Sequence, residues 1–290
     1  MTTPIEQPRM IAWLLRWAAE NEIVRAILLT STRAIPGAKV DPYSDYDVIL
    51  VLQDIRPYFE SRAWLADFGP VLAVYQDPLE PELGVLRSGY VVQYEDGLKI
   101  DFTLWPVEIM LAVAASSKLP LELDAGYQVL LDKDTLCDGL PRPTYTAYIP
   151  KPPDEAAYLT TVELLFLNAA YVAKYLRRDD LVGAKHVMDY YLRQEDLIPM
   201  LEWRVQVDHG WRVKPGPYGR NLKQRLTSDW WEAYEQTYSG HVLEDNWRAL
   251  WNAIELFRLA AREVGDRLGF QYPEELHQRG CAYLKRVQES

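Results

Sequence analysis

Five prolines lie close together near the middle of this 290-residue chain and separate two parts of different character. They are Pro141, Pro143, Pro150, Pro152 and Pro153. Proline cannot continue a helix interior or a central strand, so residues 139–153 are predicted to form a linker. Short apolar runs dominate before this stretch and helical periodicity dominates after it. We therefore expect two domains, over residues 1–138 and 154–290.

The first part alternates strand-like apolar runs with turns and helical patterns. Helices are expected at 10–21, 57–67 and 107–115, and strands at 24–29, 46–51, 71–75, 90–94, 98–105 and 128–131. This alternation is typical of a mixed α/β sheet domain. In the second part, Asp154 is expected to cap a long helix, and further helices are expected at 181–207, 230–234 and 243–269. The predicted fold class is α+β, with a mixed sheet domain followed by a helical bundle.

Two of the predicted strands carry carboxylates. Asp45 and Asp47 are two residues apart at the start of one strand, so their side chains point to the same face. Asp101 interrupts the apolar run 98–105, where an unpaired charge is costly. An isolated Asp-x-Asp pair more often caps a turn, and only its combination with Asp101 favours a metal site. If the two strands are neighbours, three carboxylates converge on an Mg²⁺ site suited to phosphoryl or nucleotidyl transfer.

The segments around these carboxylates resemble a known family. Thr30-Ser31-Thr32-Arg33, Ser44-Asp45-Tyr46-Asp47 and Ile100-Asp101-Phe102-Thr103-Leu104 look like the nucleotidyltransferase signature of the streptomycin (aminoglycoside 6-) adenylyltransferases. Later segments, among them Tyr171-Val172-Ala173-Lys174 and Tyr272-Pro273, follow in the family's order. The resemblance therefore extends from about Glu22 to Tyr272, which is nearly the whole chain.

The resemblance implies a nucleotidyltransferase domain over 1–138 and a helical substrate-binding domain over 154–290, with the site in the cleft between them. It implies transfer of AMP from Mg²⁺-ATP to a hydroxyl of an aminoglycoside, streptomycin or a relative, at the 6-position. Such a reaction inactivates the antibiotic. The residues implied to bind ATP are Ser31, Thr32, Arg33 and Lys174. The residues implied to bind Mg²⁺ and to carry catalysis are Asp45, Asp47 and Asp101, with Asp101 as metal ligand, general base or both.

The chain departs from the family's pattern at several positions. The family has Gly-Ser where this chain has Ser31-Thr32, and a serine held at positive φ costs on the order of 1 kcal/mol. Pro217 and Arg220 stand where the family has lysines, and His186 stands near an acidic position of the family's second domain. These changes leave two alternatives open. One is an adenylyltransferase acting on another small molecule or on a protein, and the other is an inert nucleotide-binding module.

The net charge is −11, from 31 Lys and Arg against 42 Asp and Glu. This excess argues against a nucleic-acid surface, which needs a basic patch. It favours a cationic acceptor through electrostatic attraction, although acidity also simply keeps proteins soluble. We therefore expect ATP and a cationic small molecule as binding partners, and no nucleic acid. Oligomeric state and the choice between ATP and GTP stay open.

The sequence also bears on cellular location. It contains no stretch of 18 uncharged apolar residues, which predicts no transmembrane helix and no membrane partner. The N-terminus lacks the basic and apolar regions of a signal peptide. Cys137 and Cys281 are far apart and are expected to be free thiols in a reducing compartment. We expect a soluble, cytoplasmic protein.

Overall fold

The structure is a computed structural model that describes residues 7–290. The chain forms two compact units, Met1–Tyr148 and Ile149–Ser290. The division between them falls within the proline-rich stretch 139–153. Each unit has its own hydrophobic core and is described by itself.

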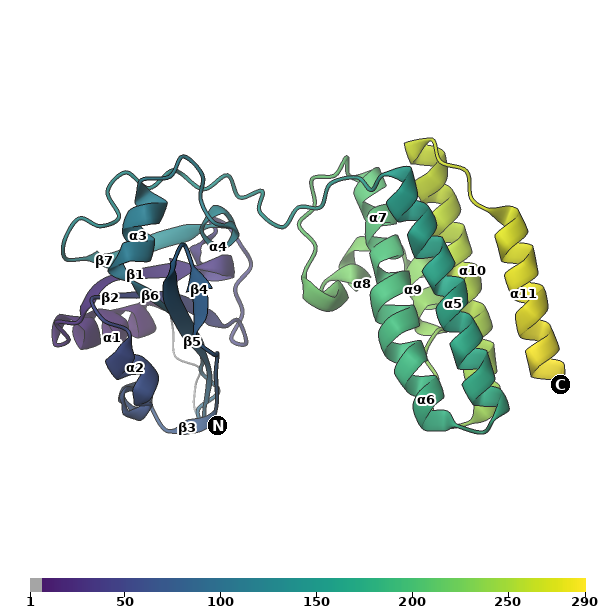
Figure 1. The fold of residues 1–290 in the computed structure, drawn as a ribbon, viewed down its shortest axis with the longest axis horizontal. Helices are drawn as coiled ribbons and strands as arrows, with labels where there is room; N and C mark the ends of the chain where they lie inside the picture. Colours follow the sequence, from purple (N-terminus) through teal and green to yellow (C-terminus); the bar gives the residue numbers. More distant parts are fainter. Residues whose placement is uncertain (1–6) are drawn as a thin grey trace. The chain divides into compact units, whose positions relative to one another are not determined.

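Unit 1 is built on a mixed seven-stranded sheet (Figure 1). Its strands are β1 Val24–Thr30, β2 Tyr46–Leu52, β3 Val71–Gln76, β4 Glu80–Glu82, β5 Val85–Tyr94, β6 Lys99–Pro106 and β7 Tyr127–Asp132. The strand order is β3-β5-β6-β2-β1-β7, and β4 pairs with β5. The neighbours β2 and β6 run parallel, while the other pairs are antiparallel. The central strands β6, β2 and β1 therefore lie side by side.

Helices cover the two faces of this sheet unequally. They are α1 Gln7–Ala19, α2 Arg56–Glu60, α3 Val107–Ala114 and α4 Leu121–Asp124, with 3₁₀ turns at η1 Ser31–Ala34 and η2 Ala63–Phe68. One face packs Val48, Leu50 and Phe102 into a core shared with α1, α2 and η2. On the other face, α3 helps bury only the far end, where Ile49 and Trp105 lie. The opposite end of that face, where β2 and β6 begin, carries polar side chains of these two strands.

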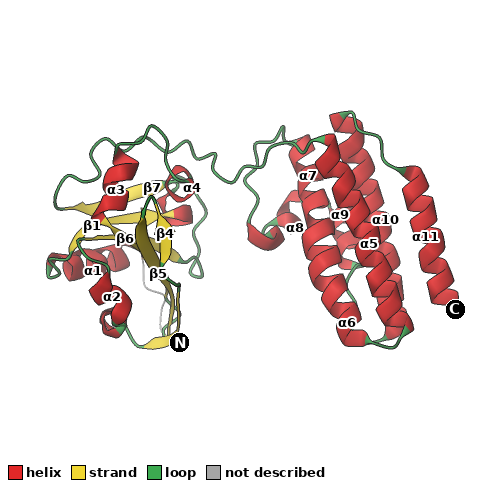
Figure 2. Ribbon diagram, in the orientation of Figure 1, coloured by secondary structure: helices red, strands yellow, loops and turns green. Residues whose placement is uncertain are grey.

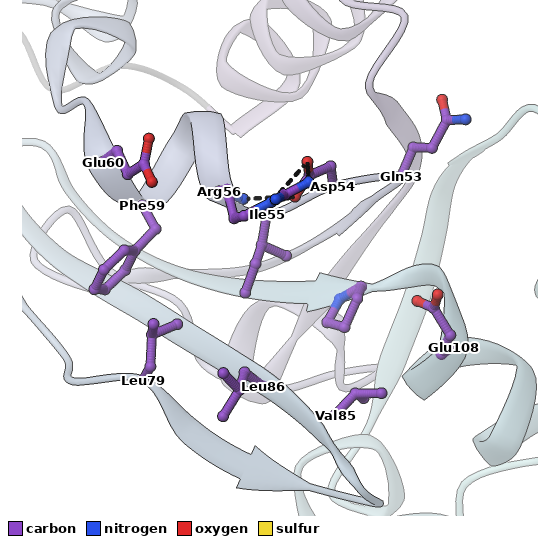
Figure 3. A pocket seen from close by; sticks show the side chains of 11 residues that line it. Gln53, Asp54, Ile55, Arg56, Phe59, Glu60, Leu79, Val85, Leu86 and Glu108 are labelled. Atoms are coloured by element: carbon purple, nitrogen blue, oxygen red, sulfur yellow. Dashed lines mark hydrogen bonds and ion pairs between the residues drawn. The ribbon is translucent and has the colours of Figure 1, made fainter.

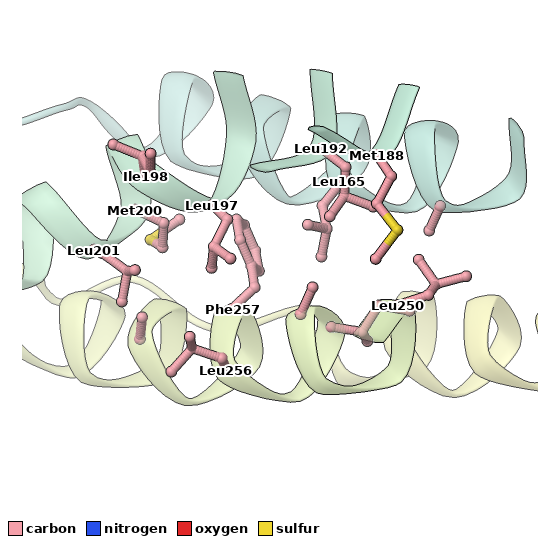
Figure 4. Packing of buried hydrophobic residues seen from close by; sticks show 14 of the residues in the cluster. Leu165, Met188, Leu192, Leu197, Ile198, Met200, Leu201, Leu250, Leu256 and Phe257 are labelled. Atoms are coloured by element: carbon pink, nitrogen blue, oxygen red, sulfur yellow. The ribbon is translucent and has the colours of Figure 1, made fainter. Parts of the chain in front are cut away.

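Unit 2 is helical, as Figure 2 shows by its colouring. It contains α5 Glu155–Arg177, α6 Leu181–His186, the π-helical segment η3 Val187–Leu197, α7 Ile198–Asp208, the short turn η4 Pro217–Gly219, α8 Leu222–Arg225, α9 Ser228–Glu235, α10 Leu243–Leu268 and α11 Glu274–Glu289. Asp154 caps α5 by accepting a hydrogen bond of 2.8 Å from the amide of Ala157. The core is apolar, with Leu165, Met188 and Phe257 packed between the long helices (Figure 4).

The predicted α+β fold is confirmed, with three local differences. The helix expected at 57–67 is broken at Ser61, which is extended and accepts a hydrogen bond of 3.3 Å from the amide of Ala63. This local side-chain contact competes with a continuous helix. The short elements β4 and α4 and the C-terminal α11 were not predicted. Segment 181–207 is one continuous run, with a π-helical stretch in its middle.

One helix of unit 2 bears on the expectation that the chain has no transmembrane helix, which stays a prediction. By length and composition, α5 is long and apolar enough to cross a membrane. Its residues Val162, Leu165 and Ala169 are fully buried in the core of unit 2, which accounts for this apolar character. Both cysteines, Cys137 and Cys281, are free thiols, as predicted.

Candidate active site

The parallel pairing of β2 with β6 brings the predicted carboxylates together. Asp47 is directly opposite Asp101 in the register of the two strands. Asp45 precedes Asp47 by two residues and lies close enough to Asp101 that one lysine contacts both carboxylates. The strands β2 and β6 are therefore neighbours in the structure, as convergence of the three side chains requires.

Lys99 lies within this acidic cluster of Asp45, Asp47 and Asp101. Its Nζ donates hydrogen bonds of 2.8 Å to Oδ2 of Asp45 and to both carboxylate oxygens of Asp101. One ammonium therefore faces three carboxylates, which leaves the cluster with excess negative charge. Sequence reasoning assigned no role to Lys99, which lies two residues before Asp101 on β6 and therefore shares its face.

The excess charge appears in the pKa values. Burial raises the pKa of Asp47 to about 6, and the negative charges of Asp101 and Asp45 add to this effect. Lys99 and a hydrogen bond from the side chain of Ser31 act in the opposite direction. Burial also raises the pKa of Asp101, against the lowering effect of its hydrogen bond to Lys99. Such an arrangement favours binding of a further cation.

Ser31 begins the η1 turn directly after β1. Thr30, the last residue of β1, is paired with Asp47, so the turn starts beside the carboxylates. Ser31 has φ of 56°, a left-handed conformation that costs an L residue about 1–2 kcal/mol. The position where the family has glycine thus keeps a backbone conformation typical of glycine. The serine compensates in part, because its side chain hydrogen-bonds to Asp47.

Arg33 connects the same turn to the segment that carries Asp45. Its Nε donates to the carbonyl of Asp45 at 3.0 Å and its Nη2 donates to the carbonyl of Ser44 at 2.7 Å. The guanidinium also lies 3.9 Å from the centre of the Tyr46 ring. These contacts fix the approach to β2. Participation of Arg33 and of the exposed Thr32 in nucleotide binding stays a prediction.

Lys174 and His186 belong to unit 2. Lys174 lies on α5, with its Nζ 5.5 Å from the centre of the Tyr171 ring, and its role in nucleotide binding stays a prediction. His186 ends α6 and contacts the rings of Tyr190 and Tyr191, with centroid separations of 6.2 and 5.4 Å. The π-helical turn that follows brings these aromatic side chains together on one side of the segment.

Carboxylate oxygens are the donors that Mg²⁺ prefers, and the acidic cluster supplies three such groups. Within residues 7–290, no group of three or more His, Cys, Asp or Glu side chains is arranged so that it could hold a metal ion. At the cluster, the ammonium of Lys99 lies between Asp45 and Asp101. The donors are of the chemical type that Mg²⁺ takes together with nucleotide phosphates, but in this arrangement the Lys99 ammonium is the cation they contact.

A larger hollow, of about 540 Å³, lies elsewhere in unit 1 (Figure 3). Ile55, Phe59 and Leu86 point into it, and Asp54 on its rim is ion-paired with Arg56. The lining comes from the chain after β2, from the β3–β4 connection, from the start of β5 and from the end of β6 and the start of α3. The acidic cluster lies at the beginning of the parallel strands β2 and β6. The convergent carboxylates lie at the other end of the strands. This hollow is therefore not the candidate site, despite its size.

Comparison with known proteins shows which family this chain is similar to. The family model described as Streptomycin adenylyltransferase matches residues 6–287. The chain is 26% identical to the Aminoglycoside 6-adenylyltransferase of Bacillus subtilis (strain 168), over 92% of this chain and 93% of that protein. It is 27% identical to the Aminoglycoside 6-adenylyltransferase of Campylobacter jejuni, over 90% of this chain and 88% of that protein.

A solved structure of an aminoglycoside 6-adenyltransferase from Bacillus subtilis is 24% identical to this chain, with coverage of 99% of this chain and 100% of that one and a TM-score of 0.48. The family match spans almost the full length and includes the η1 turn and all three carboxylates. The chain therefore belongs to the streptomycin adenylyltransferase family and is a nucleotidyltransferase.

Proposed function

We propose that this protein transfers AMP from ATP to a hydroxyl of an aminoglycoside, with Mg²⁺ as cofactor and streptomycin or a relative as acceptor. The 6-hydroxyl is the expected position, by analogy with the named relatives. The observation that carries the proposal is the convergence of Asp45, Asp47 and Asp101 beside the Ser31 turn. Antibiotic inactivation is the consequence of this reaction, and the cytoplasm is the expected location.

Asp45, Asp47 and Asp101 would hold the metal ion. When bound, Mg²⁺ neutralises charge on the triphosphate and on the leaving pyrophosphate. Support for this role comes from the raised pKa of Asp47, which reflects burial and the charges of the neighbouring carboxylates. A cation relieves that repulsion, so the cluster is suited to nucleotide accompanied by a divalent ion.

The turn at Ser31 and Thr32 would bind the outer phosphates. A turn that combines backbone N–H groups with hydroxyl side chains provides convergent donors for anions. Ser31 has its left-handed conformation directly after the end of β1, where the turn begins. Arg33 would act by holding this turn against the backbone of Ser44 and Asp45.

Asp101 would serve as general base. In the reaction, the acceptor oxygen forms a bond to the α-phosphorus while the bond from that phosphorus to the β-phosphate oxygen breaks. Pyrophosphate leaves, and the proton of the acceptor hydroxyl passes to the Asp101 carboxylate. A base works best when its pKa approaches the operating pH, and burial shifts the pKa of Asp101 upward. Lys99 would keep this carboxylate in position through its two hydrogen bonds.

The proposal is tested by pyrophosphate release from purified protein with Mg²⁺ and ATP. Reactions with streptomycin, with a second aminoglycoside and without acceptor are compared, and GTP replaces ATP in a parallel series. We expect release that depends on both streptomycin and Mg²⁺. Release only with another acceptor would replace the substrate assignment. Absence of release, with tight binding of Mg²⁺-ATP, would indicate an inert nucleotide-binding protein.

A further inference from the structure

A small hollow of about 240 Å³ lies on the β5 side of the acidic cluster. Its lining residues come from the β3–β4 connection and from β4, β5 and β6. They are Asp77, Pro78, Glu80, Arg87, Ser88 and Thr103. Thr103 follows Asp101 by two residues on β6, so the two side chains share a face. Asp101 is paired with Val91 and Thr103 with Gly89 in the register of β5 and β6, so the hollow lies beside Asp101 along these strands.

The carboxylate of Asp77 is held over this face of the sheet. Gly89 is paired with Thr103, and a Cβ on Gly89 would lie 2.8 Å from Oδ2 of Asp77. The missing side chain of Gly89 therefore leaves the space that Asp77 occupies. The backbone of Asp77 is fixed as well, because its amide donates to the carbonyl of Gly89 at 3.0 Å and its carbonyl accepts from Oγ of Ser88 at 2.8 Å.

The lining of the hollow has a net negative charge, with two carboxylates against the one guanidinium of Arg87, which lies opposite Glu80 in the register of β4 and β5. Neither Asp77 nor Glu80 has an ion-pair partner within residues 7–290, although both side chains line the hollow. Arg87, the one basic side chain in the lining, is ion-paired with Glu82. An occupant with a positive group is therefore favoured, and an anionic group such as a phosphate is disfavoured.

The order of the strands separates this hollow from the turn proposed to bind the triphosphate. Passing across the sheet from β1, one meets the Ser31 turn, then Asp47 on β2, then Asp101 on β6, and then the hollow at β5. In phosphoryl transfer the attacking and leaving oxygens lie roughly in line on opposite sides of the phosphorus. With the leaving pyrophosphate on the β1 side, the attacking hydroxyl arrives from the β5 side.

We infer that this hollow is the subsite for one ring of the acceptor, in which an ammonium or guanidinium group binds Asp77 and Glu80 while a hydroxyl of the same ring lies at Asp101. The inference rests on the proposed function, which supplies the reaction. The hollow is smaller than the about 300 Å³ of the smallest pockets for drug-sized ligands, so it fits a single ring rather than a whole antibiotic. Asp77 and Glu80 are therefore binding residues for the acceptor, separate from the carboxylates proposed for catalysis.

The test compares steady-state kinetics of Asp77→Asn, Glu80→Gln and the double variant with the unchanged protein, using streptomycin and Mg²⁺-ATP. Loss of a charge-assisted hydrogen bond is expected to raise the KM for streptomycin about 10-fold to 100-fold in Asp77→Asn. The KM for ATP is expected to stay within twofold. Glu60→Gln, an exposed carboxylate at the other hollow, is the matched control and should leave both KM values unchanged.

Calorimetric titration with streptomycin separates this inference from the proposed function. If the unchanged protein binds streptomycin but releases no pyrophosphate, the proposed function fails, and weaker binding by Asp77→Asn still supports the subsite. If turnover is observed and the double variant keeps the KM for streptomycin within twofold, the subsite is overturned while the function stands. Absence of both turnover and streptomycin binding in the unchanged protein would overturn both.

Discussion

Asp47 on β2 lies directly opposite Asp101 on β6, in a pair of parallel strands that brings two acidic side chains to one face of the sheet. Half-buried neighbours of like charge are costly, and the pKa of Asp47 is raised to about 6 as a result of partial burial and of this pairing. A protein that needed only stability would be better served by uncharged residues at these positions. The cost is consistent with a site in which a cation is part of the chemistry.

The first prediction concerns the backbone of Ser31, which has φ of 56°. Replacement by glycine removes the left-handed strain but also the hydrogen bond to Asp47, whereas replacement by alanine keeps the strain and loses the hydrogen bond. We therefore expect Ser31→Gly to exceed Ser31→Ala in free energy of unfolding by about 1 kcal/mol. Urea denaturation of the two variants measures this difference directly. Equal stability of the pair would show that the left-handed conformation is absent in solution.

The second prediction concerns Lys99. In Lys99→Gln the three carboxylates lose their ammonium partner, so the pKa values of Asp47 and Asp101 should rise further. The metal-free variant should melt about 2–4 °C lower, and Mg²⁺ should raise its Tm more than it raises that of the unchanged protein. Lys118→Gln is the control, since it removes one exposed positive charge elsewhere in unit 1. A variant whose Tm and Mg²⁺ response match those of the control would contradict a counter-ion role for Lys99.

The third prediction concerns pH and unit 2. Asp196 is buried and accepts a hydrogen bond of 2.7 Å from Asn168, and burial raises its pKa to about 6. Because the folded state holds this proton more tightly than the unfolded state, stability is present at low pH and is lost as the pH rises through about 6. Between pH 5.5 and 7.5 the loss from this one group should be about 1 kcal/mol.

Denaturation of Asp196→Asn at the same two pH values provides the check. The variant should lack this part of the pH dependence, while the exposed control Asp266→Asn should retain it. An unchanged slope in Asp196→Asn would mean that Asp196 titrates at its ordinary pKa in the folded protein.

Much of the fold follows from local sequence signals. The prolines between Pro141 and Pro153 and the apolar strand runs reflect preferences of neighbouring residues, and the structure reproduces these elements. By contrast, α11 was missed because its sequence is mostly polar and only Leu284 is buried within it. The strand β4 spans three residues, Glu80–Glu82, which is too short for any periodic pattern.

The candidate site depends on contacts between distant residues, so the sequence predicts only part of it. The acidic residues stand out because Asp101 interrupts an apolar strand, but their convergence requires the parallel pairing of β2 with β6. The contact of Lys99 with Asp45, 54 positions away, could not be predicted, because it depends on the pairing of β2 with β6. Because the family has glycine at this position, the sequence raised the question of a positive φ at Ser31. The structure has a positive φ there.

The most direct test of the central claim is transfer of radiolabelled AMP from ATP to streptomycin by the Asp47→Asn variant beside the unchanged protein. We expect transfer to fall at least about 100-fold to 1,000-fold, because one charge of the acidic cluster is lost. The Tm at neutral pH should be unchanged or higher, since the substitution removes a buried charge whose pKa is raised. Near-normal transfer by a folded Asp47→Asn variant would contradict the assignment of the acidic cluster as the active site.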